Sequence, residues 1–208
     1  MWLPIIITVF TGYLLGNLNG AVSISVLFGH DDVRSHGSGN AGLTNFIRSY
    51  GLTRAGLVII IDMLKSILAC FVGRLLLQPY GYDFEGAMLG AVAVSIGHDF
   101  PALLGFRGGK GILCALAVFL ALDWKIALIC LAVFIVVVLL TRYVSLGSML
   151  AATCLAVLFV VYHNDRPWVM AGSLVLVALA IFMHRGNIVR LCKGTERKIS
   201  LRKKGKKV

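Results

Sequence analysis

Four short segments of this chain combine glycines, neutral polar side chains and bases, and together they suggest phosphate-binding chemistry. They cover residues 34–48, 97–111, 142–148 and 184–190. Glycine lets backbone N–H groups approach an anion closely, and helix N-termini add a partial positive charge. Permanent charge comes from the bases Arg48, Arg107, Lys110 and Arg185. Carboxylates are few in these segments, which disfavours a magnesium-centred site. We therefore expect no metal and no cofactor.

Each of these signals also has a purely structural explanation when it is taken alone. Residues 38–40, Ser-Gly-Asn, are typical of a helix N-cap and turn. Residues 107–111, Arg-Gly-Gly-Lys-Gly, can be a basic turn. They are not a Walker motif, because Leu104 stands where that motif needs glycine. Asp62 and Lys65, three residues apart in an apolar run, are either a self-neutralising buried pair or support for a site.

The elements that must position these segments follow from composition. Apolar residues make up 59% of the 208 residues and charged residues 14%, against about 45–50% and about 25% in soluble domains. This excludes a disordered protein, a nucleic-acid-binding domain and most soluble enzymes. We predict an all-α integral membrane protein, a single polytopic domain over residues 1–208. Its bundle of seven transmembrane helices is expected at 2–28, 55–77, 84–97 (with room to extend to 104), 112–122, 126–140, 143–162 and 167–183.

Two finer features of the bundle are predicted from local sequence. A tight turn at Asp123 should separate the fourth and fifth helices, since one helix over 112–140 would exceed the roughly 20 residues that a bilayer needs. Gly12, Gly16 and Gly20 recur every four residues and predict a close helix-packing face.

Charge counting predicts the orientation of the bundle. Residues 185–208 hold ten bases and one acid, and we expect them to be a basic cytoplasmic tail rather than a nucleic-acid-binding segment. With seven spans, the tail's side also collects Arg34, Arg48, Arg54, Arg107, Lys110 and Arg142, while the other side holds Lys125 and Arg166. The N-terminus is therefore expected outside, and all four polar segments are expected to face the cytoplasm.

Three of the segments resemble the signatures of the bacterial acyl-phosphate-dependent glycerol-3-phosphate acyltransferases, the PlsY family. The resemblance covers essentially the whole chain, in order and at family-like spacing. Leu43 and Ser66 are mild departures, where smaller residues are expected. The first signature is matched by residues 37–45 with Arg48, the second by Gly97, His98, Pro101 and 106–111, and the third by 184–187, Arg190 and 194–196, while 62–65 and 143–146 match further family patterns.

The resemblance implies an enzyme that transfers a fatty acyl group from acyl phosphate to the 1-hydroxyl of sn-glycerol 3-phosphate. The products would be lysophosphatidic acid and phosphate, in bacterial phospholipid biosynthesis. The implied location is the bacterial cytoplasmic (inner) membrane. The implied partners are the two substrates, membrane lipid and, functionally, the enzyme that makes acyl phosphate; no nucleic acid is expected. The H-x-x-x-x-D motif of other glycerolipid acyltransferases is absent from this sequence, in agreement with a donor other than acyl-CoA.

On this basis, Ser38, Arg48 and Lys110 are expected to hold phosphoryl oxygens, and His184 and Asn187 to orient glycerol 3-phosphate and its attacking hydroxyl. Further substrate contacts are expected from Gly37, Gly39, Asn40, Gly42, Thr44, Asn45, Ser145 and Ser148, and from the backbone N–H groups of Gly108, Gly109 and Gly111. Structural support is expected from Asp62, Lys65, His98 and Glu196. Acyl phosphate is already activated, so positioning and charge stabilisation suffice without a protein nucleophile. An acylated Ser38 remains the alternative route.

Three other classes fit the sequence less well. A transporter of anionic compounds would favour internal repeats and broken helices at the membrane midplane. A structural or regulatory membrane protein would depend on its tail rather than on Ser38 and Lys110. A CDP-alcohol phosphotransferase would need an Asp-rich metal signature, and the polar segments hold too few acids for one.

Overall fold

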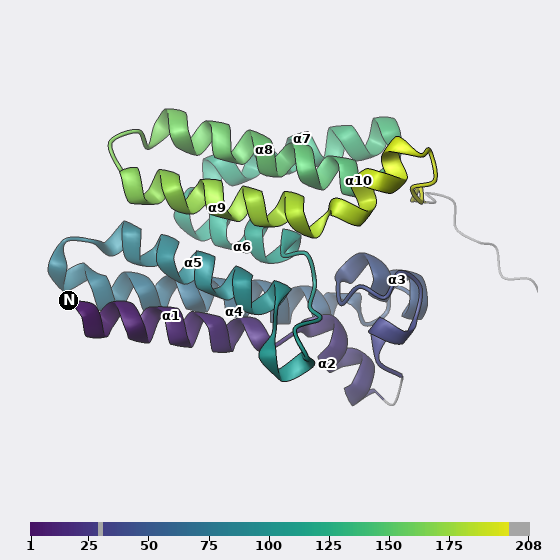
Figure 1. The fold of residues 1–208 in the computed structure, drawn as a ribbon, viewed down its shortest axis with the longest axis horizontal. Helices are drawn as coiled ribbons and strands as arrows, with labels where there is room; N and C mark the ends of the chain where they lie inside the picture. The colour runs from purple at the N-terminus through teal and green to yellow at the C-terminus, as the bar shows by residue number, and fades with distance from the viewer. Residues whose placement is uncertain (29–30, 200–208) are drawn as a thin grey trace, which may run out of the picture.

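A computed structural model describes residues 1–28 and 31–199 of the chain, so residues 200–208 of the predicted basic tail lie outside the described part. The fold is all-helical, as predicted, and its long helices lie side by side along one axis (Figure 1). The described α-helices are α1 (Trp2–Asn17), α2 (Gly20–Leu27), α3 (Leu43–Tyr50), α4 (Ala55–Leu77), α5 (Asp83–Asp99), α6 (Ile112–Leu122), α7 (Trp124–Thr141), α8 (Val144–Tyr162), α9 (Pro167–Met183) and α10 (Arg185–Cys192).

The first predicted helix, 2–28, is divided into α1 and α2, which bend by 42° where they meet. The division occurs at Leu18 and Asn19, whose backbones are extended. Asn19 caps α2 by accepting a hydrogen bond from the Val22 N–H at 3.0 Å, as helix N-caps do. The long apolar run therefore did not reveal this break, which Asn19 caps.

The turn predicted at Asp123 is confirmed. Its carboxylate accepts hydrogen bonds from the N–H groups of Lys125 and Ile126, at 3.0 and 3.2 Å, and so caps the start of α7. The helices α6 and α7 thus form a hairpin around this residue. Of the two, α6 has 11 residues and α7 has 18.

Glycines let α1, α4 and α5 pack very closely. A Cβ atom added at Gly73 of α4 would lie 2.0 Å from the Gly86 carbonyl oxygen of α5, and one added at Gly86 would lie 2.2 Å from the Gly73 carbonyl oxygen. The packing face predicted for the first helix is also confirmed, because a Cβ at Gly16 would lie 2.5 Å from the Val94 carbonyl oxygen. These three helices form one half of the bundle; α6 and α9 pack against it, and α7 and α8 pack against α6 and α9.

Within the described residues, four helices are long and apolar enough to span a membrane. The count rises to six if the bent pairs α1–α2 and α9–α10 each make one span. The segment that separates this count from the predicted seven is α6, which at about 1.5 Å per residue is too short to cross a bilayer core of about 30 Å alone.

Candidate active site

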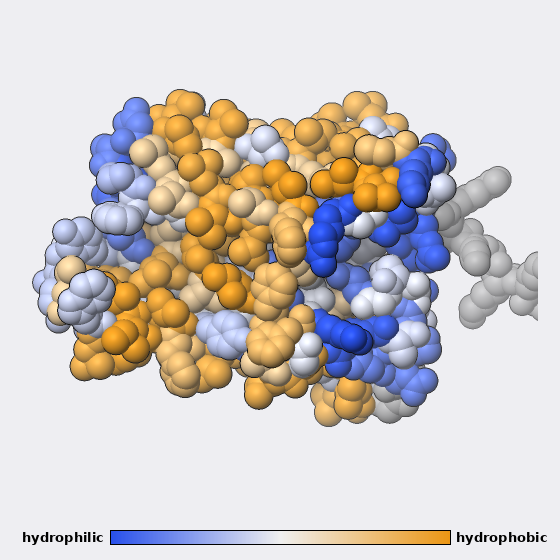
Figure 2. All heavy atoms as spheres, in the orientation of Figure 1, coloured by the Kyte–Doolittle hydropathy of each residue, from blue (hydrophilic) through white to orange (hydrophobic). Residues whose placement is uncertain are grey.

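One cavity of about 440 Å³ opens among the polar segments and continues between α6, α7 and α8. Hydrophilic residues gather at the end of the molecule that carries α3 and α10, while the flank is mostly hydrophobic (Figure 2). The cavity wall includes most of the predicted site residues: Ser38, Asn40, Gly42, Thr44, Asn45, Arg48, Asp62, His98, Lys110, Gly111, Ser145, Ser148, His184, Asn187 and Glu196. Residues as far apart in sequence as Ser38 and Arg197 therefore meet at one site.

A hydrogen-bonded chain organises the polar end of this cavity. Lys110 donates to the Asn187 Oδ1 atom, and the Asn187 Nδ2 group donates to Glu196 Oε1 at 2.7 Å. The same carboxylate accepts from Ser145 Oγ at 2.8 Å and from Arg190 Nε at 2.8 Å. Glu196, with a side chain only 8% exposed, thus fixes side chains from α8 and α10 in one arrangement.

Positive charge exceeds negative charge around these hydrogen-bonded side chains. Burial and, to a lesser degree, the nearby cation Arg190 together lower the pKa of Lys110 to about 8, while Glu196 opposes the change. Burial also lowers the pKa of Arg48, with a further contribution from repulsion by Arg197. An anion that binds between such cations offsets their mutual repulsion, so the polar end of the cavity is suited to phosphate.

Asn45, which was expected to contact substrate, instead holds the first polar segment in shape. The Asn45 amide accepts a hydrogen bond from the Ser38 N–H at 2.9 Å, and its Nδ2 group donates to the carbonyls of Val33 and His36 at 3.0 Å each. Its polar atoms are thus engaged inside the loop. Gly37 and Gly39, which are not among the described residues that line the cavity, adopt positive φ angles of 60° and 72° and turn the chain so that Ser38 reaches the cavity mouth.

The expected phosphate cradle of backbone N–H groups needs correction at two of its three glycines. The Gly108 and Gly109 N–H groups donate to the carbonyls of Asp99 and His98, at 3.2 and 3.1 Å, and are therefore already paired. A Cβ atom at Gly109 would lie 2.1 Å from His98 Nε2, so this glycine permits close packing of the loop on α5. Gly111 does line the cavity, directly before α6 begins.

His184 lies between α9 and α10, where the two helices bend by 55°, and its side chain is 3% exposed. Its Nδ1 atom is 2.7 Å from the Ala180 carbonyl oxygen. Since a carbonyl only accepts, Nδ1 carries the hydrogen, and in the neutral ring Nε2 is left as an acceptor. Asn187 follows in the first turn of α10, with its N–H donating to the His184 carbonyl at 2.8 Å, as the spacing of three predicted.

Asp62, Lys65 and His98 form a buried polar centre, of which Asp62 and His98 reach the cavity wall. Lys65 Nζ lies 2.9 Å from Asp62 Oδ1 and 2.9 Å from His98 Nδ1. It also donates to the Leu18 carbonyl and, at 3.2 Å, to the Gly16 carbonyl, which are left over where α1 ends. Lys65 itself is not among the described residues on the cavity wall. The centre therefore joins the α1–α2 break to α4 and α5.

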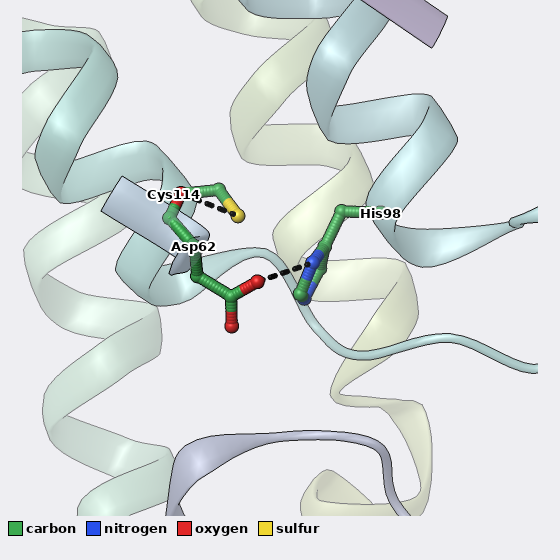
Figure 3. Close-up of side chains that lie close together, drawn as sticks. All are labelled: Asp62, His98 and Cys114. Carbon is green, nitrogen blue, oxygen red and sulfur yellow. Dashed lines mark hydrogen bonds and ion pairs between the residues drawn. The ribbon is translucent and has the colours of Figure 1, made fainter. Parts of the chain in front are cut away.

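The ligand atoms of Asp62, His98 and Cys114 lie within 4.8 Å of one another, close enough for a metal ion (Figure 3). The Asp62 carboxylate points toward the His98 ring, and Cys114 approaches the Asp62 backbone carbonyl at 3.7 Å. The Lys65 ammonium group lies next to both the Asp62 carboxylate and His98 Nδ1, which are the atoms that would hold a metal. These residues therefore fit an internal ammonium ion rather than a metal.

Two parts of the cavity were missed by sequence reasoning. Arg190 and Arg197 line it, although neither was expected to be a site residue; Arg190 belongs to the third matched signature, which was the signal that could have indicated its role. The apolar arm between α6, α7 and α8 was also missed. It is lined mainly by alanine, leucine and phenylalanine side chains, which look like any membrane core in sequence: Leu113, Ala115, Leu116, Phe119, Ala127, Cys130, Leu131, Phe134, Ala151, Ala152 and Leu155.

Comparisons with known proteins agree with this arrangement. The family model described as glycerol-3-phosphate acyltransferase matches residues 6–194. A glycerol-3-phosphate acyltransferase of Clostridioides difficile (strain 630) is 40% identical over 199 residues, covering 95% of this chain and 97% of the relative. Two crystal structures of PlsY (YgiH), an integral membrane glycerol 3-phosphate acyltransferase, are also similar. Its glycerol 3-phosphate form has a TM-score of 0.85 at 34% identity, covering 94% of this chain and 96% of that one. Its lysophosphatidic acid form has a TM-score of 0.83 at 33% identity, covering 94% and 95%.

Proposed function

Since this chain belongs to the glycerol-3-phosphate acyltransferase (PlsY) family, we propose that it transfers a fatty acyl group from acyl phosphate to the 1-hydroxyl of sn-glycerol 3-phosphate. The products are lysophosphatidic acid and inorganic phosphate. The observation that carries the proposal is a cavity that has both a cationic end and an apolar arm, because both substrates bear phosphate and one bears an acyl chain.

In the proposed reaction, the glycerol hydroxyl oxygen forms a bond to the acyl carbonyl carbon, and the bond between that carbon and the phosphate oxygen breaks. Lys110 and Arg48 hold phosphoryl oxygens and offset the charge that builds on the leaving phosphate. Ser38 adds a hydrogen bond at the cavity mouth. Asn187 orients glycerol 3-phosphate, and Glu196 keeps Asn187 and Arg190 in place.

We propose that His184 is the base that accepts the proton of the attacking glycerol 3-phosphate hydroxyl. With Nδ1–H held by the Ala180 carbonyl, the Nε2 atom is the acceptor available to that hydroxyl inside the cavity. The hydroxyl proton passes to Nε2 as the new ester bond forms. Direct transfer is preferred over acylation of Ser38, because the acyl phosphate already carries a good leaving group and the described structure records no base hydrogen-bonded to the Ser38 hydroxyl.

The proposed topology has seven helical passes, with α1–α2 and α9–α10 each counted once. Ion pairs group Asp123 with His163 and Glu85 with Arg166 at the end opposite the cavity mouth. The cationic end collects the bases of the polar segments, so the positive-inside rule puts it in the cytoplasm and the N-terminus outside. The proposed location is the bacterial cytoplasmic membrane, where an acyl-phosphate-forming enzyme supplies the donor.

The test supplies glycerol 3-phosphate to the purified protein in lipid, with palmitoyl phosphate in one reaction and palmitoyl-CoA in another. The proposal predicts lysophosphatidic acid only from palmitoyl phosphate. Lysophosphatidic acid formed from palmitoyl-CoA would refute the assignment of acyl phosphate as the donor. Incubation with labelled palmitoyl phosphate alone tests the route, since acyl label retained on wild-type protein but not on Ser38→Ala would refute direct transfer.

A further inference from the structure

The apolar arm of the cavity is built from one face of each of three helices. On α7, the lining residues Ala127, Cys130 and Phe134 recur at helical spacing. On α8, the wall changes from Ser145 at the polar end to Leu155 at the other, a distance of about 15 Å at 1.5 Å per residue. Small side chains keep the space between the helices open. The arm therefore has the shape and polarity of a site for one straight alkyl chain whose head lies among the cations.

The arm has a definable floor. Phe119 of α6 and Ala127 of α7 both line the cavity, and each lies four residues from the Asp123 turn. At 1.5 Å per residue both are about 6 Å from that turn, so the two residues line the arm at a similar depth. Phe119 is 1% exposed and Ala127 is 1% exposed. A large ring thus closes the arm from one helix, while a methyl group leaves room on the other.

The space behind Phe119 is filled rather than open. Its ring packs edge-on against Phe159 of α8 at 4.9 Å between centroids, and Phe159 in turn contacts the His163 ring at 4.9 Å. Phe159 is fully buried. Neither Phe159 nor His163 is among the described residues that line the cavity. The Phe119 ring is therefore what separates the arm from the far end of the bundle.

We propose that Phe119 and Ala127 set the longest acyl chain that this enzyme accepts, with Phe119 as the stop against the terminal methyl group. This inference rests on the proposed function, since it assumes that the alkyl chain of the acyl donor occupies the arm. A chain one methylene too long must push the Phe119 ring into Phe159. A discrimination of about tenfold or more per excess methylene is typical of a rigid apolar pocket.

The test is a chain-length profile of kcat/KM, measured with lauroyl, myristoyl, palmitoyl, stearoyl and arachidoyl phosphate at saturating glycerol 3-phosphate. Phe119→Ala and the milder Phe119→Leu are expected to raise the ratio of kcat/KM for long donors to that for short donors by about tenfold. Ala127→Leu fills the arm from the opposite helix, so it is expected to shift the profile toward shorter donors. Leu128→Ala and Leu128→Phe are matched controls, because Leu128 is 47% exposed on the outer side of α7.

Opposite shifts of the chain-length profile in the Phe119 variants and in Ala127→Leu, with a wild-type profile in the Leu128 controls, would support the proposed role of Phe119 and Ala127 in limiting chain length. If Phe119→Ala does not fold, Phe119→Leu and Ala127→Leu carry the test. An unchanged profile in folded, active Phe119→Leu and Ala127→Leu would overturn the inference while leaving the proposed function intact. Wild-type protein that is inactive with every acyl phosphate would instead refute the proposed function itself.

Discussion

The Asn187 side-chain amide donates to Glu196 Oε1 at 2.7 Å, which holds the start of α10 against the segment that follows it. Through its Oδ1 atom the same amide accepts a hydrogen bond from Lys110, 77 residues earlier in the chain. Asn187 therefore links the glycine-rich segment to the C-terminal segment. A cation that is partly buried and fixed in this way presents its charge to a ligand without having to reorganise.

The ionisation of Lys110 should be visible in the alkaline limb of the activity profile. Burial, aided by the neighbouring cation Arg190, lowers the pKa of Lys110 to about 8, so its charge is lost as pH rises through that value. We expect kcat/KM of wild type to fall correspondingly above about pH 8. Lys110→Arg keeps its charge at all these pH values. Its activity should be lower, but the alkaline decline should move to higher pH. The same decline in both proteins would exclude Lys110 as its source.

Packing of the glycine-rich segment on α5 should make Gly109 intolerant of any side chain. The added Cβ of Gly109→Ala would lie 2.1 Å from His98 Nε2, so the segment that carries Lys110 must shift. We expect a fall in kcat/KM of at least about tenfold, as for the loss of a charged contact. Gly56→Ala is the matched control, because nothing lies within 4 Å of a Cβ at that position of α4. Near-normal activity of folded Gly109→Ala would show that this packing is not required.

The buried pair of Asp62 and Lys65 should dominate stability at the α1–α2 break. Lys65→Met leaves the Asp62 carboxylate without its ammonium partner, and breaking such a pair destabilises by about 3–5 kcal/mol. In that background, Asp62→Asn removes the uncompensated charge yet keeps an oxygen for the Gly20 N–H, and should recover part of the loss. Unfolding in detergent measures both. The exposed Lys125→Met should change the free energy of unfolding by less than about 0.5 kcal/mol. Equal effects of the two lysine variants would contradict this account.

Cys192 offers a direct test of orientation. It is exposed on α10, near the polar end of the cavity, whereas Cys70, Cys114 and Cys130 are buried and Cys154 is half-buried. A membrane-impermeant maleimide should therefore label inverted membrane vesicles and leave intact right-side-out vesicles unlabelled. Labelling should disappear in Cys192→Ser. The reverse pattern would place the cavity mouth outside the cytoplasm.

Sequence reasoning predicted those features that local patterns encode. Long apolar runs predicted α4, α8 and α9 closely, and Asp123 predicted the α6–α7 turn. The α1–α2 break was missed because only Asn19 and the distant Lys65 encode it. Tertiary contacts also determine which backbone groups have hydrogen-bond partners. From the sequence, the Gly108 and Gly109 N–H groups were expected to be available to phosphate, yet they donate hydrogen bonds to carbonyls of α5. The apolar arm could not be predicted from the sequence, because alanine and leucine occur equally on helix faces that contact lipid and on faces that line a cavity.

The most direct test of the central claim is glycerol 3-phosphate binding, measured by titration calorimetry on purified protein without an acyl donor. Lys110→Ala removes a cation from the cavity, whereas Lys125→Ala removes an exposed cation near the Asp123 turn at the opposite end. The account predicts that Lys110→Ala weakens binding by at least about tenfold and that Lys125→Ala binds like wild type. Wild-type affinity in Lys110→Ala would contradict the assignment of the cationic end as the phosphate site.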